Sequence, residues 1–470
     1  MSLSNKLFNF FNKAIVEEYA DFPGPPPSFP FGNALDFLGA QPWEVTTGFA
    51  ANYGPIYVVW FANKPQIAIN APEYFRAVLV DKSWKQYHKD SPIEALEPVI
   101  TKYTPFLANP PQWKSMRKRD PFSSTWFDDW LQAQIAPLRA SLVVRSKELA
   151  ETSKLYTLDS LPVLQRMSFD AFSISAIGKY LPDKIYDLFV SLGKTGSKRL
   201  TTLFLTKKVL NPFFYPKRKK WLGYFKEQIA NSYANPNDAA TDLLQWVRRY
   251  GSELSDEAAT ASTADIFYGG AYSVTSVLVT AFYFLGLPEN REILDTFKKA
   301  AKKLFHEKPN FTYADLQEVE ILEQIIRECM RIFPPVPFYS RNSSTTQVLY
   351  LNDYRVPTNT PIIISNYYLQ RSDKHWDEPL TFQPSRWTKE VRKNNPYDSD
   401  YFFPFGRGPR ACMGMPFALM YIRIALISFY AHARFELATK ANYEQSFFFG
   451  VMLPKGVKGK VLLDQEEKGE

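Results

Sequence analysis

A cysteine inside a glycine-rich loop is the residue of this chain with the clearest chemical potential. The loop runs from Phe405 to Gly414 and reads Phe-Gly-Arg-Gly-Pro-Arg-Ala-Cys-Met-Gly. Glycines such as Gly406 permit backbone conformations that direct N–H groups at an anion, which a Cys412 thiolate would be. Arg410 carries a guanidinium, which pairs well with carboxylates, and an apolar neighbour such as Phe405 keeps water away from a metal-bound sulfur. These residue types suit a thiolate ligand of a haem iron, with Arg410 on a haem carboxylate.

An isolated cysteine is more often a small buried apolar residue than a ligand, so the pattern around it has to decide. The loop resembles the haem-binding loop of the cytochrome P450 family, Phe-Gly-x-Gly-x-Arg-x-Cys-x-Gly, at every fixed position. The resemblance extends from the proline-rich stretch near residue 23 to the C-terminus. It implies that Cys412 is the proximal ligand of haem b (iron protoporphyrin IX), within a loop shaped by Phe405, Gly406 and Gly414.

Two further sets of side chains resemble the same family. Glu328 and Arg331 lie three residues apart, on one face of an expected helix. The segment Phe-Gln-Pro-Ser-Arg-Trp supplies Arg386, and in the family this arginine completes a buried triad that braces the fold. Trp113 and Arg117 share a helix face, and in the family such a pair hydrogen-bonds a haem propionate, as Arg410 is also expected to do.

The expected distal helix departs from the family, which usually has Ala/Gly-Gly-x-Asp/Glu-Thr, with an acid and an alcohol that deliver protons. Here Gly269 and Gly270 are followed by Tyr272 at the acid position and Ser273 at the alcohol position. The serine hydroxyl can donate and accept hydrogen bonds, but a tyrosine with a pKa of about 10 is a poor substitute for a carboxylate. All four residues are expected to line the distal oxygen and substrate site. Either water replaces the acid, or the enzyme uses oxygen that is already at the peroxide level.

Three functions therefore stay open. The favoured one is a haem-thiolate monooxygenase that inserts one atom of O₂ into a lipophilic substrate, such as a fatty acid or a terpenoid, with electrons from a separate protein. The alternative is a hydroperoxide isomerase, lyase or peroxygenase of the same fold, which needs no reductant. A non-enzymatic haem sensor is disfavoured because the catalytic scaffold is intact.

The positive charge of the chain favours an acidic partner. The net charge is +8, and one basic cluster (Lys114, Arg117, Lys118 and Arg119) surrounds the expected propionate residues. We expect this cluster to bind an acidic ferredoxin or a flavodoxin-type electron donor. A second cluster at residues 217–220 is expected near a substrate entrance or in weak peripheral contact with a lipid surface. No recognition motif for nucleic acid accompanies the charge.

Length alone would suggest about three domains, but no break in composition supports that division, so one large unit is as credible. The resemblance implies one large, mainly α domain with small β-sheet regions. The chain has 470 residues, of which 45% are hydrophobic, and two cysteines. It shows neither a flexible linker nor a repeat, and no disulfide framework follows from two cysteines. Residues 1–22 are expected to form a short amphipathic segment and the start of the proline-rich hinge, and residues 23–470 the catalytic domain. The resemblance implies that the haem lies between a long central helix and the cysteine loop.

Local patterns predict a hairpin, further strands and long helices. The hairpin is expected at residues 55–61 and 66–70, further strands at 347–351 and 361–365, and helices at 133–153, 293–303 and 415–437.

The apolar segments predict a soluble protein. Leu7, Phe8, Phe11 and Ile15 recur at helical spacing, so a short N-terminal helix is expected to pack on its own protein. From Ile266 to Leu287 no residue is charged, which would suit a membrane span, but the glycines and hydroxyl residues in this run favour a buried core helix. Without a long apolar run at the N-terminus, we expect a soluble, cytoplasmic protein of the bacterial type.

Overall fold

The computed structural model describes residues 2–89, 106, 108–119, 122, 125–155, 157–201, 207–237, 239, 241–250, 256–394, 399–438, 443–448 and 450–464. The chain divides into two compact units, and each is built from segments distant in sequence. The first comprises Met1–Glu94, Val336–Thr381 and Lys393–Cys412, and the second comprises Ala95–Pro335, Phe382–Arg392 and Met413–Glu470. The fold is mainly helical with small sheets, as the sequence predicts.

The first unit is built on a four-stranded sheet in the order β1-β2-β7-β4. Its strands are β1 (Ile56–Phe61), β2 (Lys64–Ile69), β7 (Pro361–Ser365) and β4 (Phe338–Asn342), and a separate pair is formed by β5 (Leu349–Leu351) and β6 (Tyr354–Val356). The helices of this unit are α1 (Leu3–Phe11), α2 (Lys13–Glu18), α3 (Pro42–Tyr53), α4 (Pro72–Leu79) and α18 (Asn366–Arg371), with the 3₁₀ turns η1 (Ala34–Phe37), η2 (Lys82–Gln86) and η7 (Gly408–Arg410). The predicted hairpin is confirmed, because β1 and β2 pair antiparallel with Ile56 opposite Ile69.

The N-terminal helix α1 docks on this unit through one narrow face. The ring of Phe8 is fully buried and lies edge-on to Trp60, with 5.5 Å between ring centroids. Of the other apolar residues at helical spacing, Leu7 and Phe11 are exposed, whereas Ile15 is half-buried. The N-terminal segment is thus helical, divided at Asn12 into α1 and α2, and it packs on its own unit through Phe8 and Ile15.

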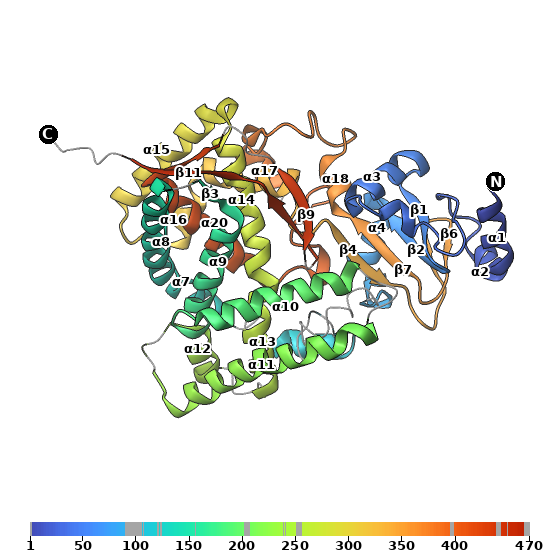
Figure 1. Ribbon diagram of the computed structural model, residues 1–470, viewed down its shortest axis with the longest axis horizontal. Helices are drawn as coiled ribbons and strands as arrows, with labels where there is room; N and C mark the ends of the chain where they lie inside the picture. Colours follow the sequence, from blue (N-terminus) through green and yellow to red (C-terminus); the bar gives the residue numbers. More distant parts are fainter. Residues whose placement is uncertain are drawn as a thin grey trace. The chain divides into compact units, whose positions relative to one another are not determined.

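The second unit contains most of the helices (Figure 1). They are α6 (Gln112–Arg119), α7 (Phe127–Ala133), α8 (Ile135–Leu155), α9 (Ser160–Ile177), α10 (Asp183–Thr201), α11 (Lys207–Ala234), α12 (Leu243–Tyr250), α13 (Asp256–Ile266), α14 (Tyr272–Gly286), α15 (Arg291–Glu307), α16 (Tyr313–Gln317), α17 (Glu320–Ile332) and α20 (Met415–Tyr430). Shorter turns are η4 (Phe267–Ala271), η5 (Pro288–Asn290) and η6 (Pro384–Arg386), and α19 (Lys389–Asn394) spans a boundary between the units.

The apolar run in mid-chain forms the centre of the second unit. Helix α13 continues through the π-helical turn η4 into α14, and α14 packs against α9, α17 and α20. Nearly every residue of α14 is buried, which is the environment predicted for a core helix. Figure 1 shows this continuous helix running between the helices that surround it.

The C-terminal part of the second unit is β-structure. Strand β11 (Lys458–Leu463) pairs with β8 (Ala433–Leu437) and with the short β3 (Leu158–Asp159), and β9 (Glu444–Phe448) forms a hairpin with β10 (Val451–Lys455). The prediction of one helix over residues 415–437 is wrong at its end. Helix α20 stops at Tyr430, and residues Ala433–Leu437 join the edge of the sheet, where β11 from the far C-terminus is their hydrogen-bond partner.

Candidate active site

The cysteine loop has the backbone conformation that its glycines predict. Gly406 and Gly408 both adopt positive φ angles, +74° and +69°, a region that only glycine enters freely. A Cβ atom on Gly408 would lie 2.1 Å from the carbonyl oxygen of Leu79, so this position also requires a glycine for close backbone contact. The Cys412 N–H donates to the carbonyl of Phe405 at 2.8 Å. The loop is therefore closed upon itself, and Cys412 is exposed at its end.

A tyrosine that the sequence analysis missed anchors this loop. The hydroxyl of Tyr339, on β4, accepts a hydrogen bond from the Gly406 N–H at 2.9 Å and lies 2.9 Å from the carbonyl oxygens of Phe403 and Pro404. Burial raises the pKa of Tyr339 above its usual range, with the nearby Cys412 acting in the same direction. The hydroxyl therefore keeps its proton and can donate to the loop. No local sequence pattern links Tyr339 with a loop so far along the chain.

Two guanidinium groups stand close together beside the loop. Burial and the neighbouring Arg341 lower the pKa of Arg410 to about 9, and Arg341 is itself buried on β4, where it donates to the carbonyl of Ser340 at 2.7 Å. Two partly desolvated cations at close range repel each other. An anionic group such as a haem carboxylate would neutralise them, so the residues present fit the predicted cofactor.

The other cysteine of the chain is unsuited to be a ligand. Cys329 is fully buried in α17. Burial and the adjacent Glu328 carboxylate raise the pKa of its thiol well above the usual value, so the neutral thiol is the stable form. Of the two cysteines, Cys412 alone combines exposure with a glycine-rich loop.

The structure brings the predicted triad together in the second unit. The carboxylate of Glu328 accepts from the Nε and a terminal nitrogen of Arg331, both at 2.9 Å, and from the Nε of Arg386 at 3.0 Å. Two donors that the sequence analysis did not assign complete the site, the Trp387 indole N–H at 2.9 Å and the Gln383 backbone N–H at 3.0 Å. Glu328 and Arg331 have fully buried side chains, so these bonds compensate for the loss of hydration of both charges.

A second buried ion cluster lies on the same helix and was also missed. Glu323 on α17 binds Arg423 of α20 at 2.6 Å and Arg327 at 3.2 Å. The guanidinium of Arg423 also donates to the hydroxyl of Tyr313 at 2.8 Å. The cluster fixes α17 against α20, the helix whose N-cap is Gly414. Residues so far apart in the sequence give no pattern that would reveal this pairing.

The central helix widens to a π-helical turn at the predicted distal motif. Ser273 donates to the carbonyl of Gly269 at 3.1 Å or to that of Gly270 at 3.0 Å, so its hydroxyl serves carbonyls in the turn where the α-helical bonding pattern changes. The glycines differ in their surroundings. A Cβ atom on Gly270 would lie 2.2 Å from the ring of Phe172, whereas one on Gly269 would have no atom within 4 Å. Gly269 and Ser273 thus mark the open face of the helix.

Tyr272 lies on a different face of the helix from Ser273. Its side chain is fully buried, stacked on the ring of Phe189 at 4.6 Å with 13° between planes, and 4.9 Å from the ring of Phe448. Burial raises the pKa of Tyr272 well above its usual value, and Tyr186 acts in the same direction. The neutral phenol is therefore the stable form, and its surroundings are aromatic.

A cluster of buried hydroxyl groups connects the first turn of α14 to α9 and α20. The Thr275 hydroxyl donates to the carbonyl of Ala271 at 2.6 Å and lies 3.0 Å from the Ser168 hydroxyl, which also accepts from Tyr421 at 3.1 Å. Tyr421 belongs to α20 and Ser168 to α9. Three helices therefore meet at buried hydroxyl groups next to the π-helical turn.

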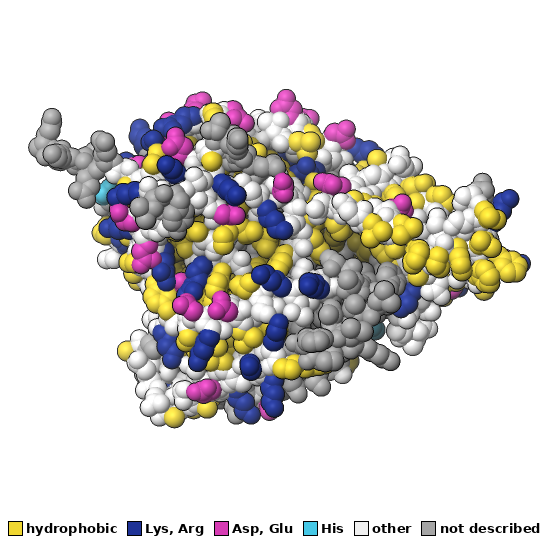
Figure 2. Space-filling model, in the orientation of Figure 1, with side chains coloured by type: hydrophobic (Ala, Val, Ile, Leu, Met, Phe, Trp, Pro, Cys, Tyr) yellow, Lys and Arg dark blue, Asp and Glu magenta, His cyan; other side chains and the backbone are white. Residues whose placement is uncertain are grey.

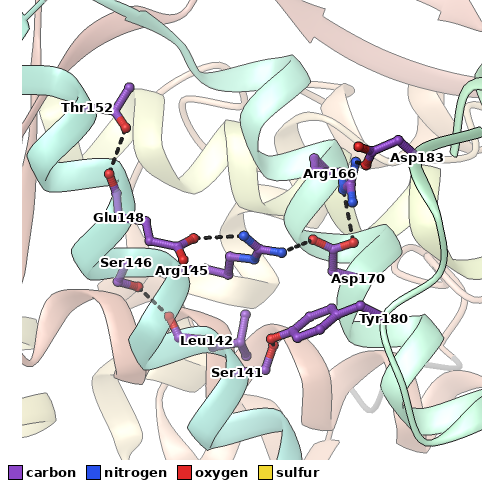
Figure 3. Close-up of polar contacts among 10 residues, drawn as sticks. All are labelled: Ser141, Leu142, Arg145, Ser146, Glu148, Thr152, Arg166, Asp170, Tyr180 and Asp183. Carbon is purple, nitrogen blue, oxygen red and sulfur yellow. Dashed lines mark hydrogen bonds and ion pairs between the residues drawn. The ribbon is translucent and has the colours of Figure 1, made fainter.

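Figure 3 shows the ion network that holds α9 in place. The buried Asp170 carboxylate binds Arg145 of α8 at 2.8 Å and Arg166 at 2.9 Å. Arg166 also binds Asp183 of α10 at 2.7 Å, and Arg145 also binds Glu148 at 2.7 Å. Burial raises the pKa of Asp170, and the two arginines oppose that effect. The network joins α8, α9 and α10, and α9 packs directly against the central helix α14.

The predicted propionate pair shares one face of α6. The guanidinium of Arg117 lies 6.0 Å from the centroid of the Trp113 ring, a cation–π distance. Both side chains are half-buried, whereas Lys114 and Lys118 are exposed on the other face. Phe405 and its neighbours through Cys412 belong to the first unit, whereas α6, Gly414 and the central helix belong to the second.

Comparison with known proteins decides the family. The family model "Cytochrome P450" matches residues 22–461, nearly the whole chain. The protein belongs to the cytochrome P450 family. Members of this family are oxidoreductases that bind haem b through a cysteine thiolate and act as monooxygenases. The alternative reaction on hydroperoxides receives no support from these findings.

Similar characterised proteins come from animals. Cytochrome P450 3A14 of Cavia porcellus is 25% identical over 434 residues, which cover 86% of this chain and 83% of the relative. Cytochrome P450 3A5 of Homo sapiens is 26% identical over 440 residues, with coverage of 86% and 83%. Cytochrome P450 3A56 of Fundulus heteroclitus is 26% identical over 443 residues, with coverage of 86% and 84%.

These relatives overturn the prediction of a soluble, cytoplasmic protein of the bacterial type. They are eukaryotic enzymes of the membrane-bound, microsomal kind. The described residues also include one helix, Ala259–Gly286, with the length and hydropathy of a membrane span, although 72% of its most apolar window is buried. The prediction relied on the lack of a long N-terminal apolar run, but exposed apolar surface is enough for attachment to a membrane.

Proposed function

We propose that this cytochrome P450 oxidises a lipophilic substrate, such as a fatty acid or a terpenoid, with Cys412 as the ligand of the haem iron and an acidic protein as the electron donor. The observation that carries the proposal is the exposed Cys412 in a loop whose tight turn depends on Gly406 and Gly408, within a chain whose other cysteine is buried. When bound, the haem would supply the oxygen chemistry, and the thiolate would favour O–O cleavage.

The residues of this chain would hold the cofactor and prepare the site. Arg410 would bind a haem carboxylate, with Arg341 adding positive charge beside it. Trp113 and Arg117, both on α6, would bind the oxygens of a haem propionate. Glu328 and its partners would keep α17 fixed against the segment that carries Arg386, which is a supporting role.

Proton handling is assigned to Ser273. Its hydroxyl has a choice of two carbonyl acceptors, on Gly269 and Gly270, so it can rotate to hold or pass a proton at Oγ. Tyr272 contributes no proton in this proposal, because its side chain is enclosed by Phe189 and Phe448. Water, and not the tyrosine, would then take over the role of the acid that the family usually has at this position.

The assignment of Cys412 as the haem ligand is tested with two variants, Cys412→Ser and Cys329→Ala. Reduced wild-type protein exposed to carbon monoxide should give the red-shifted Soret band of thiolate-ligated haem. Cys412→Ser should lose this band while its far-ultraviolet circular dichroism stays unchanged. Cys329→Ala, the matched control in the core, should keep the band. A Cys412→Ser protein that retains the band would refute the assignment.

The exposed face of α6 is the proposed docking site for the donor. Lys114 and Lys118 lie one helical turn apart and both are exposed, while their neighbours Trp113 and Arg117 are half-buried. An acidic two-iron ferredoxin would be attracted to this face at low ionic strength. Because such attraction acts over about 10 Å at 0.1 M salt, the effect should be seen in the rate of association.

Charge reversal on α6 tests this docking site. The double change Lys114→Glu with Lys118→Glu should slow haem reduction by a two-iron ferredoxin about tenfold at low salt, and high salt should remove the difference. Lys299→Glu, at an exposed position on α15, is the control and should have little effect. Equal rates of haem reduction for both variants at low salt would exclude this face as the docking site of the donor.

The preference for a lipophilic substrate rests on the residues near the open face of the central helix. Aromatic rings of α10 and β9, for example Phe189 and Phe448, lie against Tyr272 of α14, the residue that precedes Ser273 in the chain. Pockets lined by such side chains favour apolar ligands. The resemblance to the family also implies that the segments near 90–110 and 190–220 line the pocket, and these segments lie partly outside the described residues.

A further inference from the structure

The hydroxyl end of the Tyr272 ring occupies the space that a side chain at Gly193 would fill. We call this contact the peg (Tyr272) and socket (Gly193). A Cβ atom on Gly193 would lie 2.4 Å from the hydroxyl oxygen of Tyr272 and 3.0 Å from its Cζ. Gly193 stands in the interior of α10, where glycine is about 1 kcal/mol less favourable than alanine. The approach of the tyrosine explains why this position has no side chain.

The ring of Tyr272 is also held from both sides. Phe189 lies one helical turn before Gly193 on the same face of α10 and stacks on the tyrosine at 4.6 Å. Phe448, from the end of β9, approaches to 4.9 Å, and its Cε1 would lie 3.0 Å from a Cβ on Gly193. The peg is therefore enclosed by α10 and by the tip of the β9–β10 hairpin.

Hydrogen bonds continue the contact among the same three elements. Ser197, one further turn along α10, donates to the carbonyl of Phe447 in β9 at 3.5 Å. Ser276, one turn after Tyr272 in α14, donates to the carbonyl of Met452 in β10 at 2.6 Å. The spacing of α10, α14 and the hairpin is thus set at the level of Tyr272, where the largest side chain stands.

We propose that Tyr272 is a specificity-determining positioning residue, whose ring and hydroxyl set the distance of α10 and the β9–β10 hairpin from the central helix and thereby the size of ligand accepted beside Gly269 and Ser273. Successive residues of a helix point about 100° apart, so Tyr272 can fill the packed face while Ser273 serves the open one. This inference rests on the proposed function, because it takes the open face as the substrate side.

Four variants test the peg. Gly193→Ala should lower the melting temperature by several degrees, in the haem-free as well as the haem-loaded protein. Gly223→Ala in α11 is the matched control, because a Cβ there has no atom within 4 Å. In a Tyr272→Phe background, Gly193→Ala should cause a clearly smaller loss, since the contact at 2.4 Å with the hydroxyl is gone and only the two contacts at 3.0 Å remain. Equal losses in the two backgrounds would refute the peg and socket.

Two azoles of different size test the role in specificity. Imidazole and 4-phenylimidazole both bind haem iron through nitrogen, and each binding event shifts the Soret band. Because Phe189 and Phe448 prevent the tyrosine from turning away, the added methyl of Gly193→Ala should push α10 outward. The dissociation constant of imidazole divided by that of 4-phenylimidazole should then rise about tenfold. Adding Tyr272→Phe to Gly193→Ala should return this ratio towards the wild-type value.

The outcomes separate this inference from the proposed function. A normal azole spectrum with an unchanged ratio in Gly193→Ala would show that the contact serves packing alone, which overturns the specificity role. A wild-type protein that gives no azole spectrum would overturn the proposed function and the specificity role together. The melting temperatures of the haem-free proteins still decide whether the peg exists.

Discussion

Two adjacent glycines of the central helix show how differently the same residue type is used. Gly270 lacks a side chain because the ring of Phe172 stands where a Cβ would be, 2.2 Å away, whereas Gly269 faces open space. Gly270→Ala should therefore lower the free energy of unfolding by about 1–3 kcal/mol through overpacking. Gly269→Ala should not lower it, because an unobstructed alanine is favoured over glycine in a helix by up to about 1 kcal/mol. Urea unfolding of the haem-free proteins measures both, and similar losses would contradict the distinction.

The sequence alone predicts residues whose partners are local or whose pattern is dense. Cys412 is recognised from the pattern of its own loop, and the pairing of Glu328 with Arg331 follows from helical spacing. Tyr339 and Glu323 were missed because their partners lie far along the chain. Tyr272 was assigned to the distal site because its position matched a motif, but a motif does not tell which neighbours a helix face will meet.

At the scale of elements, the carboxylate of Glu328 joins α17 to the segment around η6. It accepts five hydrogen bonds, from Arg331, Arg386, Trp387 and the Gln383 backbone. Glu328→Gln leaves two arginines without their anion in a buried site, so the free energy of unfolding should fall by about 3–5 kcal/mol. Urea denaturation followed by tryptophan fluorescence measures the loss.

A matched change on the same helix provides the control. Glu320 is 43% exposed and pairs with Arg392 at 3.4 Å. Because exposed ion pairs contribute only about 0–1 kcal/mol, Glu320→Gln should be nearly neutral. Comparable losses in the two variants would mean that burial of the Glu328 site does not govern its contribution.

The element boundaries illustrate where sequence patterns stop being informative. The sequence analysis extended the helix after Met415 to residue 437, yet the helix ends at Tyr430 and Ala433–Leu437 becomes a strand. The strand exists because β11, which ends at Leu463, supplies its hydrogen bonds. Such pairing depends on a tertiary contact that the segment's own residues do not specify.

At the scale of the whole molecule, exposed apolar side chains gather at the N-terminal end of the first unit. Those of α1 and the following loop that remain open to solvent are Leu3 (75%), Leu7 (40%), Phe10 (76%), Phe11 (63%), Phe29 (41%), Phe31 (51%), Leu35 (51%) and Leu38 (73%). We call this set the N-terminal apolar patch. The rings of Phe11 and Phe29 lie 5.2 Å apart, which makes it continuous, and Figure 2 shows hydrophobic side chains covering that end.

The membrane-bound nature of the relatives gives this patch a specific expectation. Because α1 is fixed by the buried Phe8, its outer residues are presented without unfolding, and a lipid surface would bury them at about 25 cal/mol for each Å² of apolar area. The triple change of Leu3, Phe10 and Phe11 to serine should weaken binding to phosphatidylcholine vesicles at least about tenfold in a sedimentation assay.

Charge and location provide the controls for this prediction. The region carries both signs, with Lys6 and Lys13 against Glu17 and Asp36, so binding to neutral vesicles should change little with salt. Tyr350→Ser, at a side chain 63% exposed elsewhere in the first unit, should bind as the wild type does. If the triple variant sediments as strongly as the wild type, the attachment lies elsewhere on the chain. If the triple change only abolishes dimers in gel filtration without lipid, a second copy of the chain, and not a membrane, covers the patch.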